Sequence, residues 1–153
     1  MSPDHVFEKR PKAMADAEIL LVEDDDFEAK TVIRAFSEAR IANRITRVED
    51  GVEALETLLG DWAANLGEHK LILLIDLNMP RMNGIELLRE IRSDPKLRRL
   101  VCFVLTTSSS EQDIADAYDL NVAGYVVKSQ AGEDFRQLVQ LIDDYWTTVR
   151  MPE

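Results

Sequence analysis

Side chains able to do chemistry follow four apolar segments of this sequence, each at the point where the segment ends. They are the carboxylates of Glu23, Asp24 and Asp76, the hydroxyl of Thr106 and the ammonium of Lys128. Neighbouring carboxylates repel one another unless a cation compensates their charge, and hard oxygen ligands suit Mg²⁺. Beside such a cation a carboxylate can attack phosphorus, and an ammonium and a hydroxyl can then stabilise the phosphoryl oxygens. These residues therefore indicate phosphoryl chemistry, provided that the fold brings them together.

The elements that must position these side chains alternate along the chain. Short apolar runs predict five buried strands, at 19–22, 44–48, 71–75, 101–105 and 123–127. Apolar residues at helical spacing predict amphipathic helices after them, at about 26–40, 52–62, 84–92, 111–120 and 135–149, with Asp25 as the N-cap of the first. This alternation is typical of a parallel sheet covered on both faces. Ligands of such sheets bind at the carboxyl ends of the strands, where the five side chains would meet.

Composition excludes several classes of protein. The chain has 153 residues, which suits one domain, and its 29 acidic against 18 basic residues give a net charge of −11. Phosphate backbones and anionic membranes would repel so acidic a chain, so we expect it to bind neither nucleic acid nor membrane. Cys102, the single cysteine, lies in an apolar run and is predicted to be a small core residue. One cysteine and no apolar run of the ~20 residues that span a bilayer favour the cytoplasm.

The two ends of the chain differ from its middle. Residues 1–17 mix Pro, Lys, Glu and Asp without periodicity and are predicted to form a flexible N-terminal arm. The alternating pattern begins at Glu18 and continues to about residue 150, which predicts one domain over 18–150. Because the chain ends at Glu153, we expect no output domain.

Four motifs resemble the receiver domains of two-component response regulators. They are the runs 19–24, 73–80 followed by Asn83-Gly84, 104–106 and 124–128. The resemblance covers about residues 18–150. It implies a flavodoxin-like (βα)5 doubly wound fold, with a five-stranded parallel sheet in the order 2-1-3-4-5.

The resemblance also implies a role for each site residue. Asp76 would be the phosphoacceptor, and Asn78 would offer its backbone carbonyl to Mg²⁺. Of the acidic pair, Asp24 would bind the metal directly and Glu23 would act through water. Three more residues would interact with the phosphoryl group or respond to it. Lys128 would pair with the phosphoryl oxygens, Thr106 would hydrogen-bond to them, and Tyr125 would be the aromatic switch that turns inward when Thr106 moves.

Two residues depart from the commonest family pattern. The first acid is Glu23 rather than Asp, and Ser129 follows Lys128 where many receivers have Pro. The family's bond there is usually cis, and a cis bond without proline costs ~3 kcal/mol, so the geometry of this loop stays open. Within the family, the chain is most similar to single-domain response regulators of phytochrome-type histidine kinases. The features that carry this narrower match are the Glu-Asp pair, the Leu-Thr-Thr-Ser run, the Lys-Ser ending and the Tyr145-Trp146 tail.

The function that follows from the resemblance is phosphoryl acceptance rather than turnover of a substrate. A sensor histidine kinase, of phytochrome type in the narrower match, would phosphorylate Asp76, and the chain would assist its own phosphorylation and dephosphorylation. The signal would leave through altered protein contacts or through transfer to a downstream phosphotransfer protein. Tyr145, Trp146 and Val149 extend the last helical stripe. They either complete the domain's own core or form a self-association surface, and we favour a homodimer.

Other interpretations are weaker. Each site residue alone is equally well a helix cap, a turn residue, a core residue or a solvated charge; their joint occurrence at successive strand ends is what favours the receiver. A phosphatase with an aspartyl nucleophile would normally have a second acid where Asn78 stands. A receiver-like interaction module that takes no phosphate would not need Asp24, Asp76, Thr106 and Lys128 intact.

Overall fold

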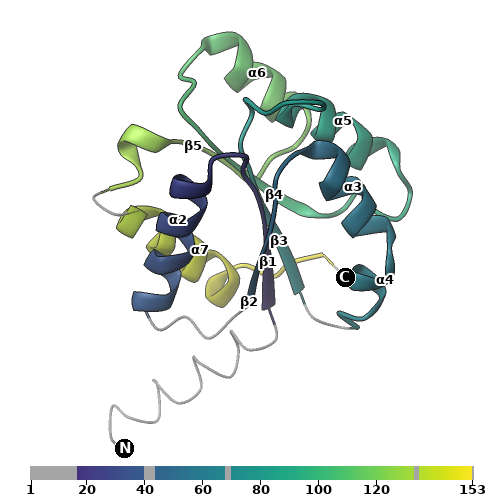
Figure 1. Ribbon diagram of the computed structural model, residues 1–153, viewed down its shortest axis with the longest axis horizontal. Coiled ribbons are helices and arrows are strands. Elements are labelled where there is room, and N and C mark those ends of the chain that lie inside the picture. Colours follow the sequence, from purple (N-terminus) through teal and green to yellow (C-terminus); the bar gives the residue numbers. More distant parts are fainter. Residues whose placement is uncertain (1–16, 40–43, 68–69, 133–134, 153) are drawn as a thin grey trace, which may run out of the picture.

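A five-stranded parallel sheet runs through the middle of the molecule, with helices on both faces (Figure 1). The computed structural model describes residues 17–39, 44–67, 70–132 and 135–152. The strands are β1 (Ala17–Val22), β2 (Arg44–Val48), β3 (Lys70–Ile75), β4 (Val101–Thr106) and β5 (Gly124–Val127). Their order is β2-β1-β3-β4-β5 and every neighbouring pair is parallel, which confirms the predicted fold.

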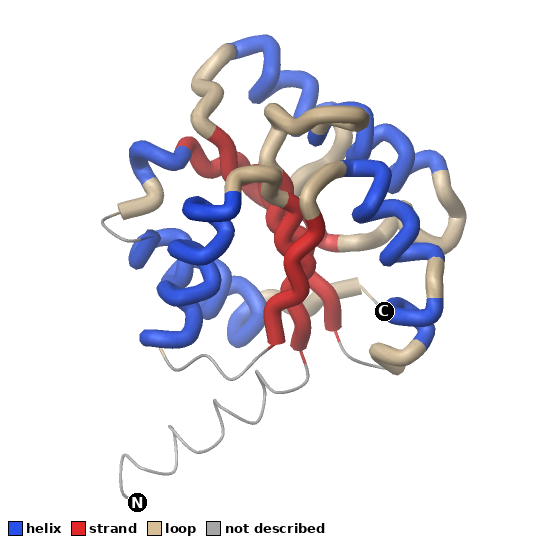
Figure 2. Tube along the Cα trace, in the orientation of Figure 1, coloured by secondary structure: helices blue, strands red, loops and turns tan. Residues whose placement is uncertain are grey.

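The helices divide into two layers (Figures 1 and 2). They are α2 (Asp26–Glu38), α3 (Gly51–Leu59), α4 (Asp61–Ala64), α5 (Gly84–Ser93), α6 (Glu111–Asp119) and α7 (Arg136–Thr148), with a 3-10 turn, η1 (Lys128–Gln130), after β5. Helices α2 and α7 cover one face of the sheet, and the others cover the opposite face. Within the described residues, none of these helices is long and apolar enough to cross a bilayer.

The central strands are apolar throughout because both of their faces are covered. In β1, Ile19 and Leu21 pack toward α2 and α7, whereas Leu20 and Val22 pack toward α3 and α5. The same alternation continues through β3 and β4. It places Cys102 in the second layer, fully buried, where burial raises the pKa of its thiol to about 12. Cys102 is therefore a core residue, as predicted.

The predicted helical stripe over residues 52–62 is not one helix. It divides at Gly60, whose extended backbone (φ −103°, ψ −167°) ends α3 and precedes the single turn of α4. Glycine favours this break because it gains little from staying helical. Leu59, the last residue of α3, is 56% exposed and does not join the core.

The last stripe and the first segment also differ in detail from the sequence pattern. Phe135 has a left-handed backbone (φ 60°) and lies just before α7, and Val149 lies just after it. Residues 1–16 of the predicted arm lie outside the described residues. Ala17 is the first residue of β1, where it pairs with Lys70.

Candidate functional site

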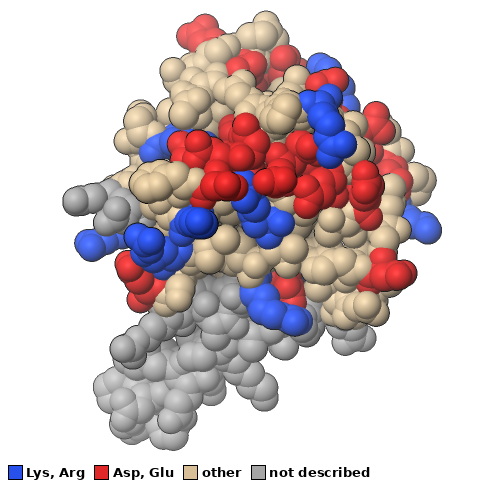
Figure 3. Space-filling view, viewed as in Figure 1, with Lys and Arg blue, Asp and Glu red and all other residues tan. Residues whose placement is uncertain are grey.

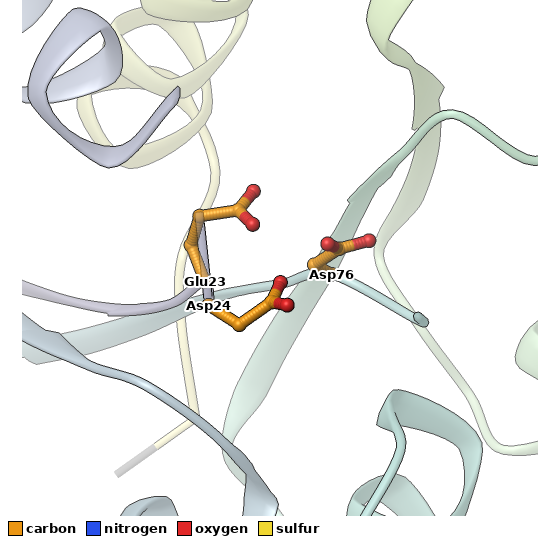
Figure 4. A group of neighbouring side chains, drawn as sticks. All are labelled: Glu23, Asp24 and Asp76. Carbon is orange, nitrogen blue, oxygen red and sulfur yellow. The ribbon is translucent and has the colours of Figure 1, made fainter. Parts of the chain in front are cut away.

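Three carboxylates meet at the carboxyl edge of the sheet (Figure 4). Glu23 and Asp24 follow β1, and Asp76 follows the neighbouring strand β3. The hydrogen bonds between strands continue one residue past the strand ends. The N–H of Glu23 donates to the carbonyl of Val48 (3.0 Å), and the N–H of Asp76 donates to the carbonyl of Val22 (3.0 Å). Oxygen atoms of the three carboxylates lie within 4.8 Å of one another. The sheet itself therefore creates the acidic cluster that the sequence predicted.

Burial makes this cluster costly without a compensating charge. Glu23 and Asp76 are buried, whereas Asp24 is exposed. Burial raises the pKa of Glu23 to about 8; repulsion from Asp76 adds to the rise, and a hydrogen bond from Lys128 opposes it. Acidic side chains also gather in a band across this face of the molecule (Figure 3). The edge thus attracts cations.

Lys128 brings a positive charge into the cluster from the end of β5. Its ammonium lies 2.7 Å from Oε1 of Glu23 and 3.6 Å from Oδ2 of Asp76, and it also contacts Glu28. Burial lowers the pKa of Lys128, but these carboxylates outweigh burial and raise it. The ammonium therefore stays charged beside Asp76. All peptide bonds in the described residues are trans, including the bond between Lys128 and Ser129.

The loop between β3 and α5 holds Asn78 against the cluster. The N–H of Asn78 donates to Oδ1 of Asp76 (3.3 Å). Further along, the N–H of Gly84 donates to the carbonyl of Leu77 (3.0 Å), which closes the loop. A Cβ atom on Gly84 would lie 2.5 Å from the carbonyl oxygen of Asp76, so no other residue fits there unless the backbone moves. Steric contact with the backbone of Asp76 thus explains why glycine follows Asn83 in this motif.

A bidentate ion pair anchors the same loop to α3. The guanidinium of Arg81 donates to both oxygens of Asp50, at 2.8 and 3.0 Å, and Asp50 is the N-cap of α3. Beside it, the N–H of Gly51 donates to the carbonyl of Met82 (3.2 Å). Because Arg81 and Asp50 are 31 residues apart, their local sequence gives no sign of this anchor.

The chemistry of these donors fits a hard divalent cation. The group offers carboxylate oxygens from Glu23, Asp24 and Asp76, and among the described residues neither a thiolate nor an imidazole joins it. Such oxygen donors suit Mg²⁺ or Mn²⁺ better than soft metals.

Comparison with known proteins identifies the family to which this edge belongs. The response regulator receiver domain matches residues 19–140 of the chain. This chain belongs to the response regulator receiver domain family. The receiver domain is similar to "Response regulator Rcp1" of Synechocystis sp., with 34% identity over 135 residues, which are 88% of this chain and 92% of Rcp1.

Solved structures agree with this assignment. The Mn²⁺-bound form of Rcp1 matches with a TM-score of 0.76 and 34% identity, covering 90% of this chain and 99% of Rcp1. The phosphorylated cyanobacterial phytochrome response regulator RcpA matches with the same TM-score, identity and shares of both chains. The bacteriophytochrome response regulator RtBRR matches with a TM-score of 0.70 and 34% identity, covering 90% of this chain and 84% of RtBRR. This protein is therefore a receiver-domain response regulator with phytochrome-linked relatives.

Thr106 and Tyr125 of the receiver domain are joined through one residue of the loop after β4. The hydroxyl of Thr106 accepts from the N–H of Ser108 (3.4 Å), and the hydroxyl of Tyr125 donates to the carbonyl of Ser108 (2.9 Å). Thr106 is fully buried and Tyr125 is half-buried. A change at Thr106 thus has a short covalent and hydrogen-bonded route to Tyr125. Ser108 makes both bonds through its backbone, so its residue type gives no sign of this link.

Two more residues at the edge were missed. Glu28 on α2 contacts Lys128, and Arg47 on β2 donates to the carbonyl of Glu23 (2.8 Å) and to Oδ1 of Asp26 (2.7 Å). Glu28 lies three residues after a helix cap, where an acid is ordinary, so its sequence position gives no signal of a contact with the last strand.

The aromatic residues near the C-terminus belong to the domain's own core. Trp146 is buried, and the ring of Tyr145 packs edge-on against Phe103 with centroids 5.1 Å apart. Leu141 of α7 and Val149, which follows the helix, are exposed, at 41% and 42%.

Proposed function

We propose that this receiver domain accepts a phosphoryl group on Asp76 from the phosphohistidine of a sensor kinase. The observation that carries this proposal is the position of Asp76, which is buried beside Glu23 and Asp24 and lies 3.6 Å from the ammonium of Lys128. In the transfer, a carboxylate oxygen of Asp76 forms a bond to phosphorus while the bond from phosphorus to the donor nitrogen breaks. Lys128 neutralises charge on the equatorial oxygens.

Mg²⁺ would be held by Asp24 and Asp76 directly, by Glu23 through water and by the backbone carbonyl of Asn78. When bound, it supplies positive charge that offsets the repulsion between carboxylates and the phosphoryl group. The oxygen donors of the site support this assignment. So does Rcp1, whose structure was solved in a Mn²⁺-bound form. The same residues would assist both the phosphorylation of Asp76 and the later hydrolysis of its acyl phosphate.

The signal would pass from Asp76 through Thr106 and Tyr125. Thr106 would form a hydrogen bond to the phosphoryl group, and its movement would draw Ser108 and release or reposition Tyr125. Each change is local, but together they would shift the equilibrium between two conformations of the surface near β5 and α6. Partners would read that surface.

The proposed donor is a phytochrome-type histidine kinase, because RcpA and RtBRR are named as phytochrome response regulators. We place the exchange in the cytoplasm, where a reduced thiol such as Cys102 is expected. The phosphoryl group would then act through altered protein contacts or pass to a downstream phosphotransfer protein.

A homodimer through the C-terminal region also belongs to this proposal. Because Tyr145 and Trp146 pack in the core, the large exposed apolar residues among the described residues of this region are Leu141 and Val149. Light scattering should report a dimer that Leu141→Asp together with Val149→Asp dissociates, and a monomeric wild-type protein would contradict the proposal.

Transfer from a kinase tests the function directly. A phytochrome-type histidine kinase, labelled by autophosphorylation with radioactive ATP, is separated from nucleotide and mixed with the receiver domain. We expect the label to move to the receiver within minutes when Mg²⁺ is present, and not to Asp76→Asn. Label that stays on several such kinases, with folded wild-type receiver and Mg²⁺ present, would contradict the phytochrome assignment; equal labelling of Asp76→Asn would contradict Asp76 as the acceptor.

A further inference from the structure

The ammonium of Lys128 has a partner outside the three carboxylates of the site. Besides Glu23 and Asp76, it forms an ion pair with Glu28, which lies in the first turn of α2. The Lys128 side chain is 8% exposed, whereas that of Glu28 is 32% exposed, so the pair bridges the buried site and the surface. An ammonium has three N–H donors. With two directed at Glu23 and Glu28, one is left for the oxygens of Asp76.

The local structure of α2 explains why Glu28 is free to make this contact. An acid at the third helical position usually reaches back to the N–H of the N-cap residue and closes a capping box. Helix α5 does this, because Glu86 accepts from the N–H of Asn83 (3.1 Å). In α2 the corresponding N–H, that of Asp25, donates instead to Oε2 of Glu23 (3.2 Å). Glu23 therefore takes the place of Glu28 in the cap, and Glu28 turns to Lys128.

We propose that Glu28 is a positioning residue, which holds the ammonium of Lys128 in the unphosphorylated protein and competes for it with a phosphoryl group on Asp76. The competition rests on the proposed function, whereas the hold on Lys128 does not. A phosphoryl group needs charged donors at its oxygens. Lys128 has an N–H to spare, but its ammonium lies 3.6 Å from Oδ2 of Asp76, so moving closer to a group bound there would weaken its contact with Glu28. Glu28 would thus limit how strongly the phosphorylated state is stabilised.

The hold is tested without any phosphoryl group. In NMR spectra of lysine ammonium groups, protons held in strong hydrogen bonds exchange slowly with water and give resolved signals. We expect a resolved signal from Lys128, assigned by its loss in Lys128→Arg, that broadens in Glu28→Ala. Glu86→Ala, which removes the matching acid from α5, should leave the signal unchanged. An unaltered Lys128 signal in Glu28→Ala would overturn the proposal.

The competition is tested with beryllofluoride, which mimics a phosphoryl group on a carboxylate, in the presence of Mg²⁺. Loss of a hydrogen bond between charged groups changes an equilibrium by about tenfold, so Glu28→Ala should bind beryllofluoride about tenfold more tightly. Glu28→Gln, which keeps an acceptor oxygen but not the charge, should give a smaller gain. Glu86→Ala should give none.

A double-mutant cycle separates positioning from simple removal of negative charge. If Glu28 acts through Lys128, the gain in affinity disappears when Glu28→Ala is made in a Lys128→Ala background. A gain of the same size in that background, or no gain with Lys128 present, would overturn the competition. If the wild-type protein binds neither beryllofluoride nor phosphoryl groups, the proposed function and the competition both fail, and the NMR result still decides whether Glu28 holds Lys128.

Discussion

The hydroxyl of Tyr125 donates a hydrogen bond of 2.9 Å to the carbonyl oxygen of Ser108, two residues after Thr106. Because the N–H of Ser108 bonds to the hydroxyl of Thr106, a single residue contacts both proposed parts of the switch. The loop after β4 is thereby tied to β5 on one side and to the site on the other.

Tyr125→Phe should loosen this loop without preventing phosphorylation. Loss of one hydrogen bond is expected to lower the free energy of unfolding by about 1 kcal/mol. Amide hydrogen exchange at residues 107–110 should become faster, and its change on phosphorylation of Asp76 should shrink. Tyr118→Phe, at an exposed tyrosine of α6, is the control. Exchange rates in Tyr125→Phe that match the wild type in both states would contradict a role for this hydroxyl in the switch.

Asp24→Asn and Asp25→Asn form a matched pair of adjacent substitutions. Asp24 belongs to the carboxylate cluster, whereas Asp25 caps α2 by accepting from the N–H of Glu28 (2.8 Å). Mg²⁺ at ten times its dissociation constant should stabilise the wild type by about 1.4 kcal/mol, as measured by denaturant unfolding. Asp25→Asn should keep this gain and Asp24→Asn should lose it. Equal gains in the two variants would place the metal elsewhere.

Gly84→Ala should disturb both stability and metal binding. The new methyl group would meet two backbone atoms, the carbonyl oxygen of Asp76 at 2.5 Å and the Cα of Leu77 at 2.8 Å. Neither can rotate away, so the loop must shift, at a cost of about 2 kcal/mol in the free energy of unfolding. Calorimetry should also show weaker Mg²⁺ binding, because the shift moves Asn78. Wild-type stability together with wild-type affinity would mean that the loop tolerates the added atom.

Stability in acid should report the ion pair between Arg81 and Asp50. The hydrogen bond from Arg81 holds the pKa of Asp50 below its usual range; burial opposes this, and the N–H of Glu53 adds to it. The folded pKa is therefore below the unfolded value of about 3.9, so the pair stabilises the fold above that pH and the stabilisation is lost as the pH falls through the folded pKa. Arg81→Ala should lower the unfolding free energy at pH 7, and its difference from wild type should narrow below about pH 4.

Urea unfolding across this pH range is the measurement, with Arg99→Ala as a control at an exposed arginine. A deficit in Arg81→Ala that stays constant from pH 7 down to acid would show that the guanidinium stabilises the loop by some means other than the charge of Asp50.

Much of this architecture could be predicted because it depends on local patterns. An apolar run that is buried on both faces marks a central strand whatever its neighbours are, and β1, β3 and β4 appear as such runs. Residues that directly follow parallel strands must lie at one edge, so the meeting of Asp24, Asp76 and Lys128 needed no knowledge of side-chain conformations.

The parts that could not be predicted depend on contacts between distant residues or on small differences in backbone energy. The ion pair of Lys128 with Glu28 joins residues 100 positions apart. The N–H of Asp25, to which an acid at position 28 would ordinarily reach back, donates to Glu23 instead. The apolar spacing of residues 52–62 continues past Gly60, whereas helix α3 ends just before it. Trp146 belongs to an apolar stripe of α7, and such a stripe can face either the domain's own core or a partner. Its spacing therefore could not predict which of the two it contacts.

Intact-protein mass spectrometry after incubation with acetyl phosphate and Mg²⁺ tests the central claim most directly, since it needs no partner. Asp76→Asn tests the acceptor, Asp61→Asn provides a control at an exposed acid of α4, and a chelator tests the metal. We predict a gain of one phosphoryl mass in the wild type and in Asp61→Asn, and no gain in Asp76→Asn or with the chelator. A folded wild-type protein that gains no mass under any condition, or an Asp76→Asn variant that gains as much as the wild type, would contradict the account.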